Sequence, residues 1–97
     1  MAQVTYSEQA LQDLERIAEF LVDASPASAE ATLLRIQGAI DILSTHPRIG
    51  RRSRGQLREL VISAGPSGYL ALYRFDPALD LVRVIRLRHQ REAGYRD

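Results

Sequence analysis

The sequence predicts a small α+β fold, and three observations support this class. Two segments carry apolar residues at helical spacing, and three later segments alternate apolar and polar residues as strands do. The connections between those strands have the length and the turn residues of β-hairpins. The 97 residues suggest one domain over 1–97, and 45% of them are apolar, which is enough for a packed core. We therefore expect the order β-α-α-β-β-β, an antiparallel sheet with a two-helix hairpin packed on one face.

The first elements are a short β-prone segment over residues 2–6 and an amphipathic helix from Glu8 to about Ala24. Ser7 is a favourable N-cap, and an acid such as Glu8 is favourable in the first turn. The apolar residues of this helix fall in one arc of about 140°. They are Ala10, Leu11, Leu14, Ile17, Ala18, Leu21 and Val22. Phe20 projects from the polar side of the helix.

A second helix is expected from Pro26 to about Thr45, because Ser25 can cap it and proline is favoured at the first helical position. Its main apolar stripe is Ala29, Leu33, Ile36, Ile40 and Leu43. A second apolar strip on roughly the opposite side is Ala27, Ala31, Leu34, Gly38 and Ile42. Either this second strip packs within the domain, or a partner covers it.

The C-terminal half predicts a loop over residues 47–56 and then three strands. The strands are Leu57–Ala64, Tyr69–Asp76 and Leu81–Arg88, with turns at 65–68 and 76–80. Strict alternation places Arg74 on one face with Leu70 and Leu72. It also places Arg86 and Arg88 on a face with Val82 and Val84.

Charge is divided unevenly along the chain. Residues 1–47 hold seven acids and two arginines, whereas residues 48–97 hold eleven arginines and five acids. Either the two halves neutralise each other, or the basic half meets an anionic partner. The loop arginines Arg48, Arg51, Arg52 and Arg54 either contact phosphate or are simply solvated.

The composition excludes several kinds of site. There is no cysteine and no lysine, so thiolate metal sites and lysine or cysteine nucleophiles are excluded. We expect no metal and no cofactor. No segment is apolar enough to span a membrane, and the N-terminus does not read as a secretory signal, so a cytoplasmic protein is expected.

The tail residues His89, Arg91 and Tyr95, with the strand arginines Arg86 and Arg88, are the candidate functional residues. Arginine binds phosphate, histidine moves a proton near neutral pH and tyrosine stacks on bases, so these residue types fit a metal-free ribonuclease site. The alternative is that the arginines pair with acids of this chain, namely Glu59, Asp76, Asp80 or Glu92, or with acids of a partner.

Three segments resemble the RelE/ParE superfamily of toxins from type II toxin–antitoxin modules, also known as plasmid stabilisation proteins. They are HPRIGRRSRGQLRELVI at residues 46–62, GYLALYRFD at 68–76 and VIRLRHQREAGY at 84–95. The resemblance covers nearly the whole chain and implies a toxin neutralised by a cognate antitoxin. RelE-like members cut mRNA on the ribosome, whereas ParE-like members inhibit DNA gyrase and are not nucleases.

The sequence departs from the RelE-like pattern. That branch places basic residues on the strand that matches Leu57–Ala64, where this chain has Glu59 and Val61, with only Arg58 basic nearby. Leu70 stands where the resemblance implies a catalytic arginine, while the tail positions match His89 and Tyr95. These departures favour a ParE-like gyrase inhibitor over an enzyme.

Two alternatives stay open. One is a ribosome-dependent mRNA endoribonuclease that uses His89, Arg91 and Tyr95. The other is a non-toxic remnant that only binds an antitoxin. We expect Arg86, Arg88 and Arg91 to contact the target, and Phe20, Leu34 and Ile42 to contact the antitoxin.

Overall fold

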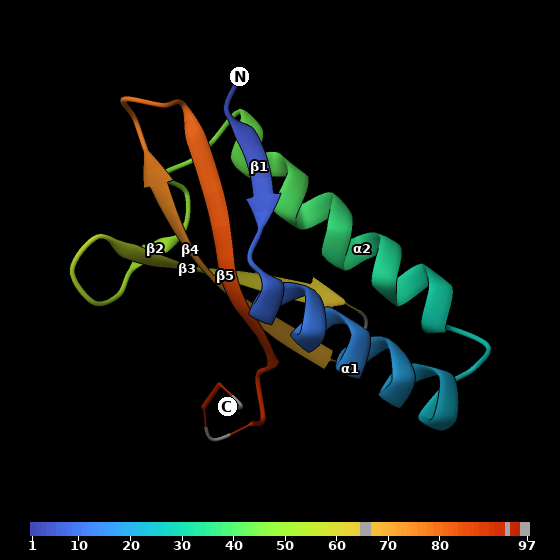
Figure 1. Ribbon diagram of the computed structural model, residues 1–97. Coiled ribbons are helices and arrows are strands. Elements are labelled where there is room, and N and C mark those ends of the chain that lie inside the picture. Colours follow the sequence, from blue (N-terminus) through green and yellow to red (C-terminus); the bar gives the residue numbers. More distant parts are fainter. Residues whose placement is uncertain (65–66, 93, 96–97) are drawn as a thin grey trace.

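The computed structural model describes residues 1–64, 67–92 and 94–95. Its elements are β1 (Gln3–Tyr6), α1 (Glu8–Ala24), α2 (Ala29–Asp41), the 3₁₀ turn η1 (Ile42–Ser44), β2 (Arg51–Arg52), β3 (Leu57–Ala64), β4 (Ser67–Asp76) and β5 (Leu81–His89). The strands form one sheet in the order β1-β5-β4-β3-β2, with both helices on the same side (Figure 1). The predicted α+β class and element order are confirmed, with β2 in addition. No helix within these residues is long and apolar enough to cross a membrane.

The sheet is mixed, so the expectation of an antiparallel sheet holds for only part of it. Strands β2, β3, β4 and β5 pair antiparallel, but β1 lies parallel to β5, with Val4 opposite Val82. A parallel neighbour requires a long crossover connection. Here the two helices and the antiparallel strands together return the chain to the side of β1.

Helix α1 has the predicted bounds and the predicted cap. The hydroxyl oxygen of Ser7 accepts a hydrogen bond from the backbone N–H of Ala10 at 3.0 Å. Ala10, Ile17 and Leu21 are buried against the sheet. Leu11 and Val22, at one edge of the predicted apolar arc, are exposed, so the buried face is narrower than the arc.

Helix α2 begins later than predicted. Ser25 and Pro26 do not start it, because Ser25 donates its backbone N–H to Leu21 and so closes α1. The next residues form a turn, in which the N–H of Ser28 bonds to the carbonyl of Ser25. The reversal between the two helices thus uses the residues expected for the first helical turn, and Ser28 takes the cap position.

One of the two apolar stripes of the second helical segment is buried, and the other is exposed. The main stripe faces the sheet, and Ile36, Ile40 and Leu43 are among the most buried side chains. Every residue of the second strip is exposed, so packing of that strip within the chain is excluded. We call this exposed set (Ala27, Ala31, Leu34, Gly38 and Ile42) the α2 strip.

The strands agree closely with their predicted bounds. Strand β3 matches, β4 begins at Ser67 rather than Tyr69, and β5 extends to His89. Gly65 and Pro66, half of the predicted turn between β3 and β4, lie outside the described residues. The region predicted as a loop contains β2, in which Arg51 and Arg52 pair with Glu59 and Arg58.

The core lies between the helices and one face of the sheet. Its largest fully buried side chains are Tyr73, Ile36, Ile40, Leu43, Ile62, Leu87, Val82 and Val84. The opposite face, which we call the outer face, is turned away from the helices (Figure 1).

Candidate functional site

A β-bulge in β5 decides where its arginines point. Tyr73 lies opposite Val84, but the preceding residue Leu72 lies opposite Arg86, so Ile85 is an extra residue in β5. The alternation of faces therefore shifts by one residue after Val84. The expectation that Arg86 and Arg88 share a face with Val82 and Val84 is wrong.

The shift places the two arginines on the outer face. Arg86 lies opposite Leu72 and Arg88 lies opposite Leu70, on the face that also carries Arg74. Arg74, however, lies at the other end of β4, where it pairs with Arg83. Arg74 therefore shares the outer face with Arg86 and Arg88 but lies at the other end of the sheet.

Asp13 on α1 completes the free edge of β5. Strand β1 ends at Tyr6, and beyond it the Ser7 hydroxyl donates to the carbonyl of Ile85 at 2.7 Å. The carboxylate of Asp13 then accepts the backbone N–H of Leu87 at 2.9 Å. A backbone group buried without a partner would be costly, so these two side chains take over the pairing where β1 stops.

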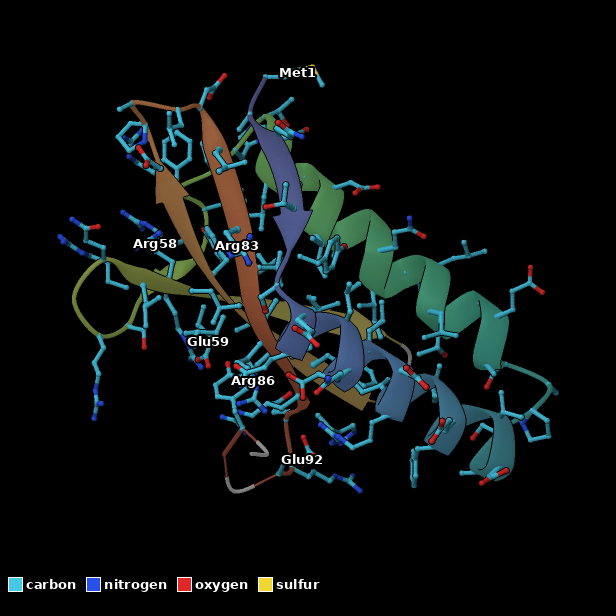
Figure 2. All side chains as sticks on the ribbon, in the orientation of Figure 1. Met1, Arg58, Glu59, Arg83, Arg86 and Glu92 are labelled. Carbon is cyan, nitrogen blue, oxygen red and sulfur yellow. The ribbon has the colours of Figure 1, made fainter. Side chains whose placement is uncertain are left out.

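The same carboxylate holds Arg86. Its two oxygens lie 2.8 Å from Nε and 3.2 Å from an Nη atom of Arg86, a bidentate arrangement. The Asp13 and Arg86 side chains are only 6% and 11% exposed. Arg86 is therefore largely buried and anchored to α1 at the edge of β5 (Figure 2).

The chain after β5 folds back through Glu92. Its carboxylate accepts the backbone N–H of His89 at 3.0 Å and pairs with Arg16 of α1 at 2.7 Å. Its carbonyl accepts a hydrogen bond from Arg88 at 2.5 Å. Glu92 thus ties the tail to both α1 and β5, but its carboxylate pairs with Arg16 of α1 and not with a strand arginine.

Tyr95, the last described residue of this tail, lies over the outer face. Its ring centre is 5.7 Å from the guanidinium carbon of Arg86 and 5.2 Å from that of Arg88, a cation–π arrangement. Its hydroxyl donates to Glu59 at 2.7 Å, and Arg51 of β2 binds the other oxygen of that carboxylate at 2.7 Å. The tail, β5, β3 and β2 are thereby linked through one glutamate.

These contacts change the pKa values of Tyr95 and Glu59. Burial and the hydrogen bond to Glu59 raise the pKa of the Tyr95 hydroxyl well above that of a free tyrosine. Burial alone would raise the pKa of Glu59, but hydrogen bonds from Tyr95 and Arg51 outweigh it and lower that pKa. Glu59 is therefore a carboxylate, and Tyr95 a neutral donor, across the physiological range.

The three candidate nuclease residues line a common groove. His89, Arg91 and Tyr95 border an open groove of about 1040 Å³ between the tail and α1. Ile17, Phe20 and Tyr69 form its apolar wall. The His89 ring contacts the edge of Tyr69, and its Nδ1 accepts the backbone N–H of Arg91 at 3.0 Å. We call this the C-terminal groove.

The predicted antitoxin residues are divided between two surfaces. Leu34 and Ile42, 59% and 48% exposed, belong to the α2 strip. Phe20, 64% exposed, lies on α1 and faces the C-terminal groove instead. Among the described residues no cluster of three His, Cys, Asp or Glu side chains could hold a metal ion.

The site is held together by Asp13, Arg16 and Glu92. The sequence patterns identified neither Asp13 nor Arg16. Asp13 lies just outside the apolar arc of its helix, one turn from Ala10 and one turn from Ile17. An acid at such a position is buried only when it is paired. That placement is the signal that could have identified it.

Tyr95→Phe is expected to loosen the tail, because it removes the hydroxyl that donates to Glu59 and keeps the ring over the arginines. Loss of one hydrogen bond to a carboxylate costs about 1.5–3 kcal/mol, and we expect the lower end for this partly exposed site. Urea unfolding at neutral pH measures this loss in the free energy of unfolding. The exposed glutamate variant Glu15→Gln is the control and should show little change.

The Tyr95→Phe variant should also change how the stability of the protein depends on pH. Because the folded-state pKa of Glu59 is lowered, its stabilising contribution is present above the unfolded-state pKa and is lost as the pH falls through the lowered value. Tyr95→Phe should therefore lose less stability than the parent protein on acidification below about pH 4.3. Equal acid sensitivity of the two proteins would contradict this role for the Tyr95–Glu59 contact.

Comparison with known proteins agrees with this fold. Two curated proteins of Caulobacter vibrioides are similar over nearly their whole length. Toxin RelE3 is 33% identical over 92 residues, covering 95% of this chain and 98% of the relative. Toxin RelE2 is 37% identical over 89 residues, covering 92% of this chain and 96% of the relative.

Solved structures of toxin–antitoxin complexes share the architecture. A chain of the chromosomal ParDE system of P. aeruginosa superimposes with a TM-score of 0.74 at 20% identity, covering 92% of this chain and 96% of that one. A chain of the E. coli RelBE complex gives 0.64 at 16% identity, covering 95% and 100%. Residues 4–94 match the family described as the ParE toxin of the type II toxin–antitoxin system, parDE. Because that match spans nearly the whole chain, the protein belongs to the ParE toxin family of type II toxin–antitoxin systems.

Proposed function

We propose that this toxin arrests growth in the cytoplasm by inhibiting DNA gyrase, without cutting RNA. One observation carries the proposal: the polar groups at the centre of the outer face are engaged with one another. Glu59 is bound by Arg51 and Tyr95, and Arg86 is bound by Asp13. Such a surface supports binding to a protein better than chemistry on a phosphate.

RNA cleavage without a metal needs cations around the phosphate and groups that are free to move protons. Here the carboxylate of Glu59 places a negative charge beside Tyr95 on the outer face, and Leu72 lies opposite it in the sheet. The raised pKa of Tyr95 makes its hydroxyl a poor proton donor to a leaving group. Electrostatic support for the transition state is thus weak at this face.

His89 is also poorly placed to act as a base. A neutral imidazole has one N–H and one acceptor nitrogen. Since Nδ1 accepts the N–H of Arg91, the proton resides on Nε2. The nitrogen that could take a proton is already occupied by the backbone.

A ribosome-dependent endoribonuclease is the second candidate. The curated relatives are named RelE2 and RelE3, and His89, Arg91 and Tyr95 do line one groove. For that activity, substrate would have to displace the Arg91–His89 and Tyr95–Glu59 hydrogen bonds.

We further propose a cognate antitoxin as the partner of this chain. The solved relatives include toxin–antitoxin complexes, and the exposed α2 strip offers an apolar surface of the kind that partners cover. Leu34 and Ile42 would lie in that interface, and Phe20 would offer a second contact at the C-terminal groove.

Among the proposed target-binding residues, Arg91 is the most accessible. Its side chain is exposed, whereas Arg86 and Arg88 lie under Tyr95. In the proposal Arg91 contacts the target directly. Arg86 and Arg88 contribute to the charge of this surface and would contact the target after the tail moves.

The purified toxin is expected to inhibit gyrase-dependent supercoiling and to leave ribosome-bound mRNA intact. Arg91→Glu should raise the concentration for half-inhibition about tenfold or more, the scale of one lost interfacial charge contact. It should also relieve growth arrest on induction while antitoxin binding persists. Arg35→Glu, the same charge reversal on an exposed position of α2, is the control for inhibition of supercoiling.

Codon-positioned mRNA cuts within minutes of induction, lost in His89→Ala, would instead establish the endoribonuclease. If the folded protein shows neither activity, the non-toxic, antitoxin-binding remnant becomes the better description.

A further inference from the structure

A second polar pocket lies at the far end of the sheet from the tail. It has a volume of about 390 Å³ and lies between the loop after η1 and the turn that joins β4 to β5. Four arginines line it, Arg48, Arg52, Arg58 and Arg74, together with Phe75 and Asp76. Figure 2 shows Arg58 and Arg83 on this half of the sheet, away from Arg86 and Glu92. We call it the arginine pocket.

The described residues do not compensate the charge of the arginine pocket. Within the described residues, none of its four arginines has a carboxylate oxygen within 4.0 Å, unlike Arg16, Arg51 and Arg86. Among the described lining residues, Asp76 is the one acid. Its Oδ1 already accepts the backbone N–H groups of Ala78 and Leu79. The pocket is therefore strongly positive.

The arginine pocket is also built rigidly. Arg58 donates to the carbonyls of Arg48 and Gly50 at 3.1 and 2.9 Å, which fixes both its own guanidinium and the loop. The N–H of Gly50 donates to the buried Tyr73 hydroxyl at 2.8 Å, and a Cβ at Gly50 would lie 2.6 Å from the Tyr73 ring. Only glycine lets the loop approach this closely.

Two further contacts orient the other cations. The guanidinium of Arg48 stacks 4.9 Å from the centre of the Phe75 ring. Arg52 is the cross-strand partner of Arg58, and Arg74 is the cross-strand partner of Arg83. Like charges directly opposite in a sheet are destabilising. The first pair lies on the helix side of the sheet and the second on the outer face, so both sides of this end of the sheet are positively charged.

We propose that the arginine pocket binds the phosphodiester backbone of a nucleic acid. Guanidinium groups bind phosphate oxygens through paired hydrogen bonds. The positive surface continues beyond the pocket, through the exposed side chains of Arg54 on one side and Arg83 on the other. A continuing row of cations suits a polymer with a regular row of phosphates better than a single small anion.

The test measures binding of labelled single-stranded DNA and RNA to the full chain by fluorescence anisotropy as a function of salt. Each phosphate contact contributes about 0.7 to the slope of log affinity against log salt for a single strand. Arg52→Gln with Arg74→Gln should lower this slope by about 1.4 and weaken binding about tenfold or more near 50 mM salt. Arg35→Gln on α2 is the matched control and should leave most of the binding intact.

A second measurement avoids dependence on variants. Inorganic phosphate titrated into the parent protein should shift the side-chain NMR signals of Arg52 and Arg58, and not that of Arg35. Absence of nucleic-acid binding near 50 mM salt, an unchanged slope in the double variant, or equal competition by polyglutamate would overturn the proposal. The last result would identify an acidic protein segment as the ligand. None of these outcomes depends on inhibition of gyrase, so this proposal and the proposed function fail separately.

Discussion

Replacing Asp13 by alanine should destabilise the protein by about 3–5 kcal/mol, the usual cost of removing one partner of a buried ion pair. The change leaves the guanidinium of Arg86, 11% exposed, without its bidentate carboxylate. It also leaves the N–H of Leu87 without its acceptor at the edge of β5. Domains of this size are stable by only about 5–15 kcal/mol in total, so the variant should be close to unfolding. Urea unfolding followed by circular dichroism measures the loss.

Two further variants test whether the loss of stability comes from the buried ion pair and not from a change in the helix. Asp23→Ala removes an exposed acid from the same helix and should change the stability by less than about 0.5 kcal/mol. Asp13→Leu combined with Arg86→Met replaces both charges by apolar groups and should recover part of the stability lost in Asp13→Ala. Equal effects of Asp13→Ala and Asp23→Ala would show that the pair carries no stability.

Elements governed by local pattern could be predicted from the sequence. The bounds of α1 follow from the Ser7 cap and the 3.6-residue period, and those of β3 from turn residues and alternation. The start of α2 could not be predicted this way. Ser25 and Pro26 suit a helix start and a turn equally well. They form a turn because the N–H of Ser25 bonds to the carbonyl of Leu21 and closes α1.

Features set by long-range pairing were not predictable from local signals. The parallel alignment of β1 with β5 depends on contacts between residues almost eighty positions apart, such as Val4 and Val82. The bulge at Ile85 has no glycine or proline to mark it, yet it reverses the faces of Arg86 and Arg88. The bulge therefore changes the positions of the candidate site residues, while the strand order is as described above.

The sequence named candidate site residues but not the partners that hold them. His89, Arg91 and Tyr95 do meet in one groove. Their chemistry depends on Glu59, which lies on β3, and on Glu92, which connects the tail to α1. Such partners become evident only when the strands are in register.

Leu34→Asp is expected to weaken binding of the proposed antitoxin at least about a hundredfold while the protein stays folded. Leu34 is 59% exposed on the α2 strip, so a carboxylate there is solvated in the free chain and should alter stability by less than about 0.5 kcal/mol. In the complex the same carboxylate would be buried against apolar residues without a partner, which costs several kcal/mol. Calorimetric titration with the antitoxin measures the loss, and circular dichroism measures the fold.

Leu79→Asp is the matched control, because Leu79 is 69% exposed on the turn between β4 and β5, far along the chain from α2. It introduces the same charge at an equally accessible leucine and should leave antitoxin affinity unchanged. Normal binding by Leu34→Asp, or loss of its fold, would show that the α2 strip is not the interface. If both variants lost affinity equally, the added negative charge alone would explain the effect. A loss confined to Leu34→Asp therefore identifies the apolar surface of α2 as the place where the toxin is neutralised.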